Sequence, residues 1–335
     1  MNDIKQWAPI MIPTLNRYEH FRKCFESLEA CVGADQTEIF IGLDYPPSEK
    51  YVEGWEKIDD FLTLKERNNG FKRLHVIRRE HNYGIDPNGN WDSLEKEIVK
   101  TYNTFIASED DNIFASNALL YFNRGLEKFR DDKRIIYICG YTHPYPFKTE
   151  GTTYYMHNTD MSAWGYATWS DRYVQMIDEL RKDVPENFSI ANFLKVRKRG
   201  YNRALQYLSL CIKQIHGFRR MTDNVMSVYA IVHDLYFVQP SKTLVRNIGW
   251  DGSGLACASR TKQKGVDIAL RHMNQEIDNS NDFVYSGDPW KYCDYNNQIA
   301  RQYSDGLMPY YQYLWSLVKF LAKSFLKYIW LIFHK

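Results

Sequence analysis

Three consecutive acidic residues, Glu109, Asp110 and Asp111, follow a short apolar run and are the first candidates for chemistry. Adjacent carboxylates repel one another unless a cation lies among them, so a hard divalent ion is a natural partner. Mg²⁺ and Mn²⁺ bind one or two carboxylates and complete their shell with water and phosphate oxygens. The triplet therefore predicts a metal site for a phosphorylated ligand. Taken alone, it also fits a solvated or capping stretch ahead of a helix expected over residues 117–128.

Polar residues also follow two other predicted strands. Asn16 and Arg17 come after the first strand, and Asp44 ends the second. Ligands of open parallel sheets bind beyond the carboxyl ends of the strands, so we expect these residues to converge with the acidic triplet. Arg17 offers a planar fork to a base carbonyl or phosphate, and Asp44 can accept from a base N–H or a ribose hydroxyl. This combination predicts a nucleoside-diphosphate site. No P-loop and no dinucleotide-binding glycine motif accompanies it.

The elements that must position these residues are visible as short apolar runs alternating with amphipathic stretches in the first 140 residues. The predicted strands cover residues 8–13, 37–43, 74–77, 104–107 and 135–139. The predicted helices are one marked by Phe21, Cys24, Phe25 and Leu28, one over 48–64 and one over 117–128. Residues 14–16 are expected to cap the first of them. Such alternation implies right-handed crossovers and an α/β fold with a mainly parallel sheet flanked by helices.

Beyond Gly140 the pattern is irregular. Residues 141–160 are rich in Thr, Pro, Tyr and His and predict a long ordered loop, which at this length suggests a functional role. Helices are expected over 164–181 and within 188–215. The second of these carries a basic cluster, for which a solvated helix face is favoured over a polyanion site. The cluster consists of Lys195, Arg197, Lys198, Arg199 and Arg203.

Composition narrows the class of protein. The chain has 335 residues and a formal net charge of +2, which argues against a general nucleic-acid binder. Its six cysteines include no C-x-x-C pair, a pattern typical of reduced thiols rather than of a zinc site or a disulfide framework. The first residues lack the charged and apolar regions of a secretory signal. We therefore expect the protein to work in the cytoplasm.

The last segment, residues 314–335, differs from the rest. Lys319, Lys323 and Lys327 recur every four residues along one side of a predicted helix, and Leu, Phe, Ile and Trp cover most of the remainder. The charge-free run 328–333 is too short for a bilayer, which needs about 20 apolar residues. A cationic amphipathic helix lying in the headgroup plane of an anionic membrane fits this pattern best. The alternative is a helix that packs on the protein's own core or on a second subunit.

Several of these motifs together resemble the GT-A-fold glycosyltransferases, of the family 2 type and of the N-acetylglucosaminyltransferase type with an E-D-D metal motif. The resemblance covers the first 175 residues and continues more loosely to Cys257. The matching segments are Ile12-Pro13-Thr14-Leu15-Asn16-Arg17, Asp44, Asn82-Tyr83-Gly84, Glu109-Asp110-Asp111 and Ala163-Trp164-Gly165-Tyr166-Ala167-Thr168-Trp169. The chain departs from the relatives at Ala256, near where some place a histidine ligand, and it lacks an acid-x-x-Arg-Trp motif.

The resemblance implies a role for each matching residue. Pro13, Thr14, Asn16 and Arg17 would form the nucleotide-contacting turn, and Asp44 would contact the nucleoside. Asp111 would ligate Mn²⁺ or Mg²⁺, with Asp110 and Glu109 near the ribose and the donor sugar. Asn82 belongs to an Asn-x-Gly element that follows the third strand. Trp164 and Gly165 would back the acceptor and donor sugars.

Inverting sugar transfer also needs a carboxylate to take the proton of the acceptor hydroxyl. Asp223, which precedes an apolar segment where relatives place this base, is our candidate, and a helix N-cap is the alternative role. The pair His233 and Asp234 is a second possibility, although a buried, hydrogen-bonded histidine is more common in apolar surroundings. His143 and His157 lie in the long loop and could touch the acceptor or the diphosphate.

The sequence thus predicts a GT-A glycosyltransferase, inverting and metal-dependent, that moves a sugar from a nucleotide donor, by resemblance a UDP-sugar, to a glycan or lipid-linked saccharide. Residues 1–140 would bind the nucleotide sugar, 141–260 would complete the same domain with acceptor and catalytic groups, and 261–335 would form an extension. The terminal helix suggests assembly of bacterial surface polysaccharide or lipopolysaccharide at the inner face of the plasma membrane. A sugar nucleotidyltransferase and a non-catalytic glycan-binding scaffold are the competing classes.

Overall fold

The structure is a computed structural model of the whole chain. It describes residues 4–84, 88–149, 151–181, 189–215, 223–254, 273–280, 283–284, 287–306 and 310–333. Ala256 and Cys257, which were named in describing the family resemblance, lie outside these ranges. For the last ten residues of the final helix, including Lys327, the description covers the backbone only.

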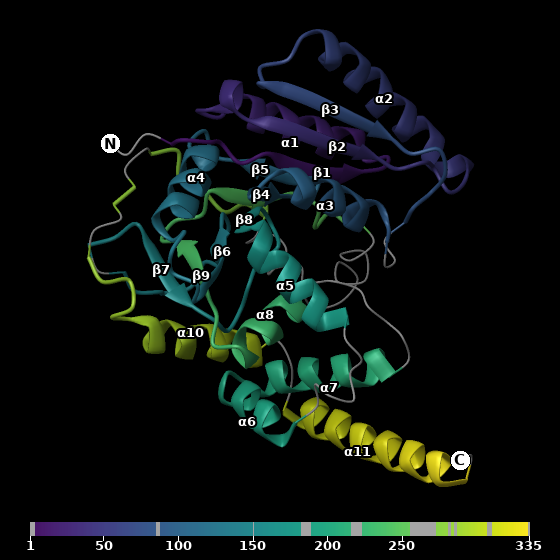
Figure 1. The fold of residues 1–335 in the computed structure, drawn as a ribbon, viewed down its shortest axis with the longest axis vertical. Coiled ribbons are helices and arrows are strands. Elements are labelled where there is room, and N and C mark those ends of the chain that lie inside the picture. Colours follow the sequence, from purple (N-terminus) through teal and green to yellow (C-terminus); the bar gives the residue numbers. More distant parts are fainter. Residues whose placement is uncertain are drawn as a thin grey trace.

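An eight-stranded sheet forms the centre of the molecule, in the order β3-β2-β1-β4-β8-β6-β9-β7 (Figure 1). Its strands are β1 (Ile10–Thr14), β2 (Glu38–Leu43), β3 (Arg73–Arg78), β4 (Thr104–Ala107), β6 (Ile135–Cys139), β7 (Tyr154–His157), β8 (Tyr166–Trp169) and β9 (Tyr236–Pro240). The first four are parallel neighbours, and β6 is parallel to β9. Only β7 and β8 pair antiparallel within this sheet. The predicted mainly parallel α/β fold is therefore confirmed.

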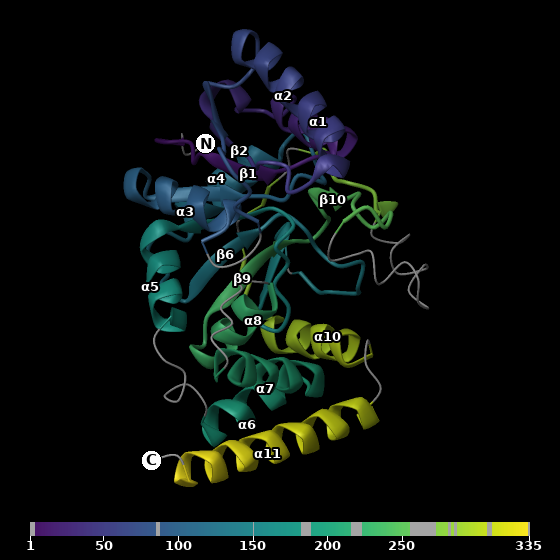
Figure 2. The same ribbon diagram turned by 90° about the vertical axis from the view of Figure 1, so that its right-hand side faces the viewer.

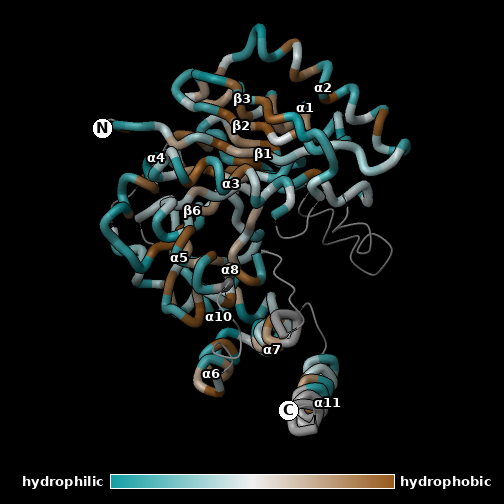
Figure 3. Tube along the Cα trace, turned by 45° about the vertical axis from the view of Figure 1, so that its right-hand side comes forward, coloured by the Kyte–Doolittle hydropathy of each residue, from teal (hydrophilic) through white to brown (hydrophobic). Residues whose placement is uncertain are grey.

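Helices cover both faces of the sheet. They are α1 (Tyr18–Glu29), α2 (Val52–Arg67), α3 (Asn90–Thr101), α4 (Ala118–Lys128), α5 (Ser170–Arg181) and α8 (Asp223–Val232), with short 3-10 turns at Ala34–Gln36 and Glu49–Tyr51. Alternate residues of β1 show why two layers form. Ile10 and Ile12 join a core with α1, α2 and α4, whereas Met11 joins a core with α3, α5 and α8. Figure 3 shows the hydrophobic residues gathered along β1, β2 and β3.

A second helical layer lies at one end of the sheet, below it in Figures 1 and 2. It consists of α6 (Ile190–Lys198), α7 (Tyr201–Ile215), α10 (Cys293–Gly306) and α11 (Tyr310–Phe333). A third apolar cluster joins α6, α7, α8 and α11, and α10 packs against β7. The predicted helical segment 188–215 is broken at Gly200, whose φ is +137° and whose Cβ would lie 2.6 Å from Asp305 Oδ1.

A short two-stranded sheet, β5 (Asn112–Phe114) with β10 (Val245–Asn247), flanks the main sheet. It joins two segments that lie 131 to 135 residues apart, since Val245 pairs with Phe114 and Asn247 with Asn112. This pairing brings the end of β10 to the acidic triplet, which lies between β4 and β5.

Three local expectations are wrong. The helix predicted over 164–181 begins only at Ser170, because Tyr166–Trp169 is a buried strand paired on both sides, by β4 and β6. The loop predicted over 141–160 contains the buried strand β7. Residues 14–16 do not cap α1, whose first turn has no side-chain cap. Thr14 lies in β1 instead and uses its hydroxyl elsewhere.

Candidate active site

The acidic triplet lies at the carboxyl end of β4, beside the end of β1. Asp110 and Asp111 are buried, and both form ion pairs with Arg17, at 2.8 Å between Arg17 Nη1 and Asp111 Oδ2. The hydroxyl of Thr14 donates a hydrogen bond of 2.9 Å to Asp110 Oδ2. Burial alone would lower the pKa of Arg17, but the two carboxylates outweigh it and raise the pKa above its usual value. The predicted turn after β1 and the triplet are therefore in direct contact.

Asp111 is also held by the segment that follows β10. Asn247 Nδ2 donates 2.6 Å to Asp111 Oδ1, and the N–H of Ile248 donates 2.8 Å to the backbone carbonyl of Asp111. A Cβ on Gly249 would lie 1.9 Å from Asp111 Oδ2 and 3.0 Å from Arg17 Nη1, so only glycine fits there. Sequence reasoning gave Asn247 and Gly249 no individual role. Their contact with Asp111 depends on the β5–β10 pairing, which the local pattern does not contain.

Glu109, the first residue of the triplet, interacts electrostatically with Asp223. Burial raises the pKa of Glu109 well above its usual value, and the neighbouring Asp111 and Asp223 carboxylates raise it further. Asp223 is therefore close enough to act on the triplet, although it is 114 residues further along the chain. Burial likewise raises the pKa of Asp110, against the opposing effect of Arg17. The site thus concentrates negative charge that a bound cation would stabilise.

Asp44 organises a turn next to this edge. Its Oδ1 accepts from the N–H groups of Tyr45 and Tyr83, at 2.9 and 2.7 Å. Its Oδ2 accepts from the N–H of Gly84 at 2.9 Å and from Asn82 Nδ2 at 3.3 Å. A carboxylate offers about four acceptor positions, so all of them are used within the protein. Asp44 and Asn82 thus fix the turn after β3 beside the carboxyl ends of β1 and β2.

Trp164 and Gly165 lie just before β8, on the other side of β4. The Trp164 ring packs edge to face with Tyr141 and Trp250, at centroid distances of 4.7 and 5.9 Å. Gly165 has φ +71°, and a Cβ there would lie 3.1 Å from the Phe114 ring. The pair therefore packs on both segments of the two-stranded sheet that holds Asp111. This brings the predicted sugar-backing element close to the triplet.

Asp223 is the first residue of α8, and one of its carboxylate oxygens accepts 2.8 Å from the N–H of Asn224. The alternative base, His233 with Asp234, follows the opposite end of this helix, roughly 15 Å away at 1.5 Å per residue. His233 instead lies 3.5 Å from Glu179, and Asp234 pairs with Lys195. Of the two candidate bases, Asp223 is the one whose charge acts on Glu109 of the triplet.

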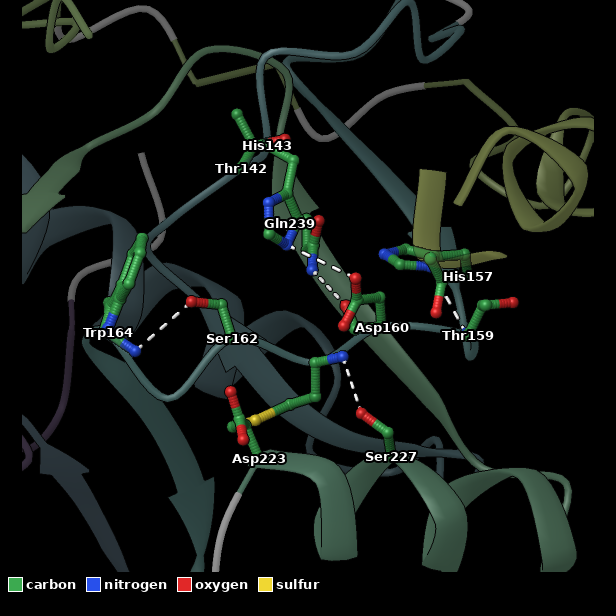
Figure 4. A network of polar contacts seen from close by, with 12 residues as sticks. Thr142, His143, His157, Thr159, Asp160, Ser162, Trp164, Asp223, Ser227 and Gln239 are labelled. Atoms are coloured by element: carbon green, nitrogen blue, oxygen red, sulfur yellow. Dashed lines mark hydrogen bonds and ion pairs between the residues drawn. The ribbon is translucent and has the colours of Figure 1, made fainter. Parts of the chain in front are cut away.

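The two loop histidines are both buried. His143 Nε2 lies 3.6 Å from Asp160 Oδ2, and burial lowers the pKa of His143 (Figure 4). His157 is stacked among Phe147 and Tyr155, and burial lowers its pKa to about 4. The His157 ring is therefore neutral at physiological pH.

The basic cluster on α6 and α7 does not form one solvated face. Lys195 binds Asp234, and the Arg197 guanidinium lies 5.5 Å from the Tyr313 ring centroid. Arg203 is 3% exposed and forms a buried ion pair with Asp160. The solvated-face expectation is wrong for Arg203, because a charge at this depth requires a partner.

Among the described residues, no three His, Cys, Asp or Glu side chains are arranged around a common metal position. The donor set nevertheless suits a hard ion, because Asp110 and Asp111 already converge on one cationic group, the Arg17 guanidinium. As the resemblance implies, Asp111 is the residue that would hold Mg²⁺ or Mn²⁺, with Asp110 and Glu109 beside it.

Comparison with known proteins finds only distant similarity. No family model and no curated protein matches the sequence. The chain is similar to S. aureus TarS 1–349 in complex with UDP-GlcNAc (10% identity, TM-score 0.42, covering 82% of this chain and 68% of that one). It is also similar to the mannosyltransferase PcManGT from Pyrobaculum calidifontis in complex with GDP-Man and Mn²⁺ (8% identity, TM-score 0.37, covering 91% and 88%). Against the longer S. aureus TarS it spans 30% of that chain, at 13% identity and TM-score 0.35. Such values do not establish a shared family or activity.

Proposed function

We propose that this protein is a glycosyltransferase that moves a sugar from a nucleoside-diphosphate donor to a glycan or lipid-linked saccharide. The observation that carries the proposal is the pairing of Arg17 with Asp110 and Asp111 at the strand ends, next to Glu109, on which the charge of Asp223 from the start of α8 acts. Arg17, together with a divalent ion held at Asp111, would neutralise the charge of a diphosphate, and Asp223 would take a proton. Inverting transfer needs both within one site.

Each residue then has a defined role. Pro13, Thr14, Asn16 and Arg17 shape the nucleotide side of the site, with the turn built by Asp44 and Asn82 beside them. Asp223 takes the proton of the acceptor hydroxyl as that oxygen bonds to the anomeric carbon. The bond from this carbon to the diphosphate breaks, and the nucleoside diphosphate leaves with the electron pair. A divalent ion held at Asp111 would supply positive charge that stabilises the leaving group.

Trp164 and Gly165 would pack against the sugar while it is transferred from the nucleotide donor to the acceptor. A Trp ring offers a flat apolar face to a pyranose, and a glycine beside it lets the backbone approach closely. By resemblance the nucleotide is UDP, and residues 141–260 would supply the acceptor side of the same domain. Residues 261–335 would form an extension to it.

We further propose that the acceptor is held at a membrane, as in assembly of a bacterial surface polysaccharide or lipopolysaccharide, with the protein on the cytoplasmic face. Two apolar stripes run along α11. Tyr313, Leu317 and Phe320 pack toward α7, whereas Leu314, Trp315, Val318 and Leu321 are 44% to 60% exposed. No helix of the described chain is long and apolar enough to cross a bilayer.

Charge favours lipid over a second copy of the chain as the occupant of the exposed stripe. Lys319 and Lys323 border this stripe, and α11 contains no acidic residue that could pair with them across a dimer. An anionic headgroup layer would satisfy both the lysines and the apolar side chains.

A donor screen tests the catalytic proposal. Purified protein is mixed with UDP-, GDP- and dTDP-sugars, with Mn²⁺ and extracted lipid-linked oligosaccharide, and products are followed by mass spectrometry. We expect one nucleotide class to stabilise the protein thermally and its sugar to reach the acceptor. Asp111→Ala should remove the nucleotide-dependent stabilisation, whereas Asp132→Ala, which breaks an ion pair with Arg134, should leave it intact. Binding of no nucleoside diphosphate would favour the scaffold class instead. Pyrophosphate release would indicate a nucleotidyltransferase.

A further inference from the structure

The segment between β7 and β8 is tied to the start of α8 by a buried polar network (Figure 4). At its centre, Arg203 of α7 forms an ion pair with Asp160, and the Arg203 side chain is 3% exposed. The same guanidinium donates 3.1 Å to Asn224 Oδ1 and 2.5 Å to Gln206 Oε1. Asn224 is the residue next to Asp223. Arg203 therefore connects Asp160 to the first turn of the helix that carries the proposed base.

Asp160 is itself fixed from the sheet. Gln239 Nε2, on β9, donates 3.1 Å to the backbone carbonyl of Asp160. The hydroxyl of Tyr155, on β7, donates 2.6 Å to Gln239 Oε1. Burial acts to raise the pKa of Asp160, but Arg203 and the nearby His143 outweigh it and hold the pKa below its usual value. The carboxylate is thus kept charged and in place.

The next residues extend this connection toward the sugar-backing turn. The N–H of Met161 donates 2.9 Å to Ser227 Oγ, one turn into α8. Ser162 Oγ accepts 3.3 Å from the N–H of Trp164. The chain from Asp160 to Trp164 is therefore in contact with α8 at two points, Asn224 through Arg203 and Ser227 directly.

We propose that Asp160 and Arg203 are positioning residues: their ion pair sets the first turn of α8, and with it Asp223, against the turn that carries Trp164. This inference rests on the proposed role of Asp223 as the base. The sequence predicts Arg203 to be one of five cations on a solvated helix face. This inference instead assigns it a role on the acceptor side of the site. Neither residue reaches the acidic triplet in the contacts described, so nucleotide binding should not depend on them.

Kinetics of paired variants test the proposal. In Asp160→Asn and Arg203→Gln we expect kcat to fall about 100-fold, since misplacing a reacting group by about 1 Å has that effect. The KM for the nucleotide donor should stay within about twofold. Arg203→Lys keeps the charge and should recover part of kcat. The matched control is Asp234→Asn, which breaks the Lys195 pair at the opposite end of α8 and should leave kcat unchanged.

Loss of one charge could simply destabilise the fold, because it leaves the other buried and unpaired. The double variant Asp160→Asn/Arg203→Gln removes both charges, and we expect it to recover the melting temperature but not kcat. If kcat recovers together with the melting temperature, the pair is merely structural and the proposal is wrong. Unchanged kcat in both single variants would also overturn it.

Hydrogen exchange separates this inference from the proposed function. Amides of residues 226–229 should exchange at least tenfold faster in Arg203→Gln than in wild type, while amides of β1 and β2 keep their protection. This readout needs no substrate. A wild-type protein that turns over no nucleotide sugar would refute the function, whereas unchanged exchange at the start of α8 would refute the positioning role.

Discussion

The nucleotide side and the acceptor side of the proposed site are built in different ways. On the nucleotide side, Thr14, Asp44 and Asp110 lie at the ends of the neighbouring parallel strands β1, β2 and β4, and the two carboxylates are held by backbone N–H groups or by the Arg17 guanidinium. On the acceptor side, Asp160, Arg203 and Asn224 come from a loop, from α7 and from α8. The first arrangement is fixed by the sheet. The second depends on the packing of helices against the sheet, so substitutions on the two sides should separate nucleotide binding from transfer.

The largest difference between the effect on the transfer rate and the effect on nucleotide affinity is expected for Asp223→Asn. Removing a general base costs about 10² to 10⁴ in rate, so kcat should fall by that factor. Nucleotide affinity should change little, because the groups assigned to the nucleotide, Arg17 and the carboxylates it pairs with, keep their mutual contacts in this variant. Donor titration by calorimetry, together with initial rates, measures both quantities. Equal losses in affinity and in rate would mean that the two sides are not separable.

The pH dependence of folding stability tests whether His157, on the acceptor side, is as buried as the structure shows. Burial lowers its pKa to about 4, whereas an unfolded histidine titrates near 6.5. Between these values the unfolded chain binds more protons, so the stability that neutral His157 contributes is complete above about pH 6.5. It is lost as pH falls toward 4 and amounts to about 3 kcal/mol at most.

His157→Gln lacks this titration and serves as the reference. Denaturant unfolding at pH 7.5, 6, 5 and 4.5 should show the wild type losing stability faster than the variant as pH falls. His143 is present in both proteins, so its own titration cancels. Parallel stability curves would show that His157 is hydrated enough to titrate normally.

Gly249→Ala affects the nucleotide side alone. The added methyl would lie 1.9 Å from Asp111 Oδ2, so either the carboxylate or the segment after β10 must shift. We expect nucleotide affinity to fall at least tenfold, which is about 1.4 kcal/mol. Gly306→Ala is the control, since its Cβ would meet nothing within 4 Å. An unchanged Kd in Gly249→Ala would mean that the Asp111 arrangement is not the one that binds nucleotide.

The difference between the nucleotide side and the acceptor side also explains which features could be predicted from the sequence. The strands of the first half, and the positions of Asp44 and the triplet at the carboxyl ends of β2 and β4, follow from β–α units whose apolar period is local. The Asp160–Arg203 pair joins residues 43 positions apart across an irregular stretch, and nothing local marks it. Strand β8 was missed because Tyr166–Trp169 is buried on both faces and therefore shows no alternation. The contact of Asn247 with Asp111 required the β5–β10 pairing.

The smallest effect is expected on α11, which lies apart from both sides of the site. Val318→Asp places a charge in the exposed apolar stripe, where the side chain is 54% exposed. It should lower binding to anionic vesicles roughly tenfold, about 1.4 kcal/mol, while leaving kcat on a water-soluble acceptor unchanged. Gln312→Asp adds the same charge at another exposed position of the helix, outside this stripe, and controls for electrostatics. If both variants lose vesicle binding equally, charge alone governs the association. If neither does, the exposed stripe of α11 is not a membrane surface, because replacing an inserted apolar side chain with a carboxylate must weaken partitioning into lipid.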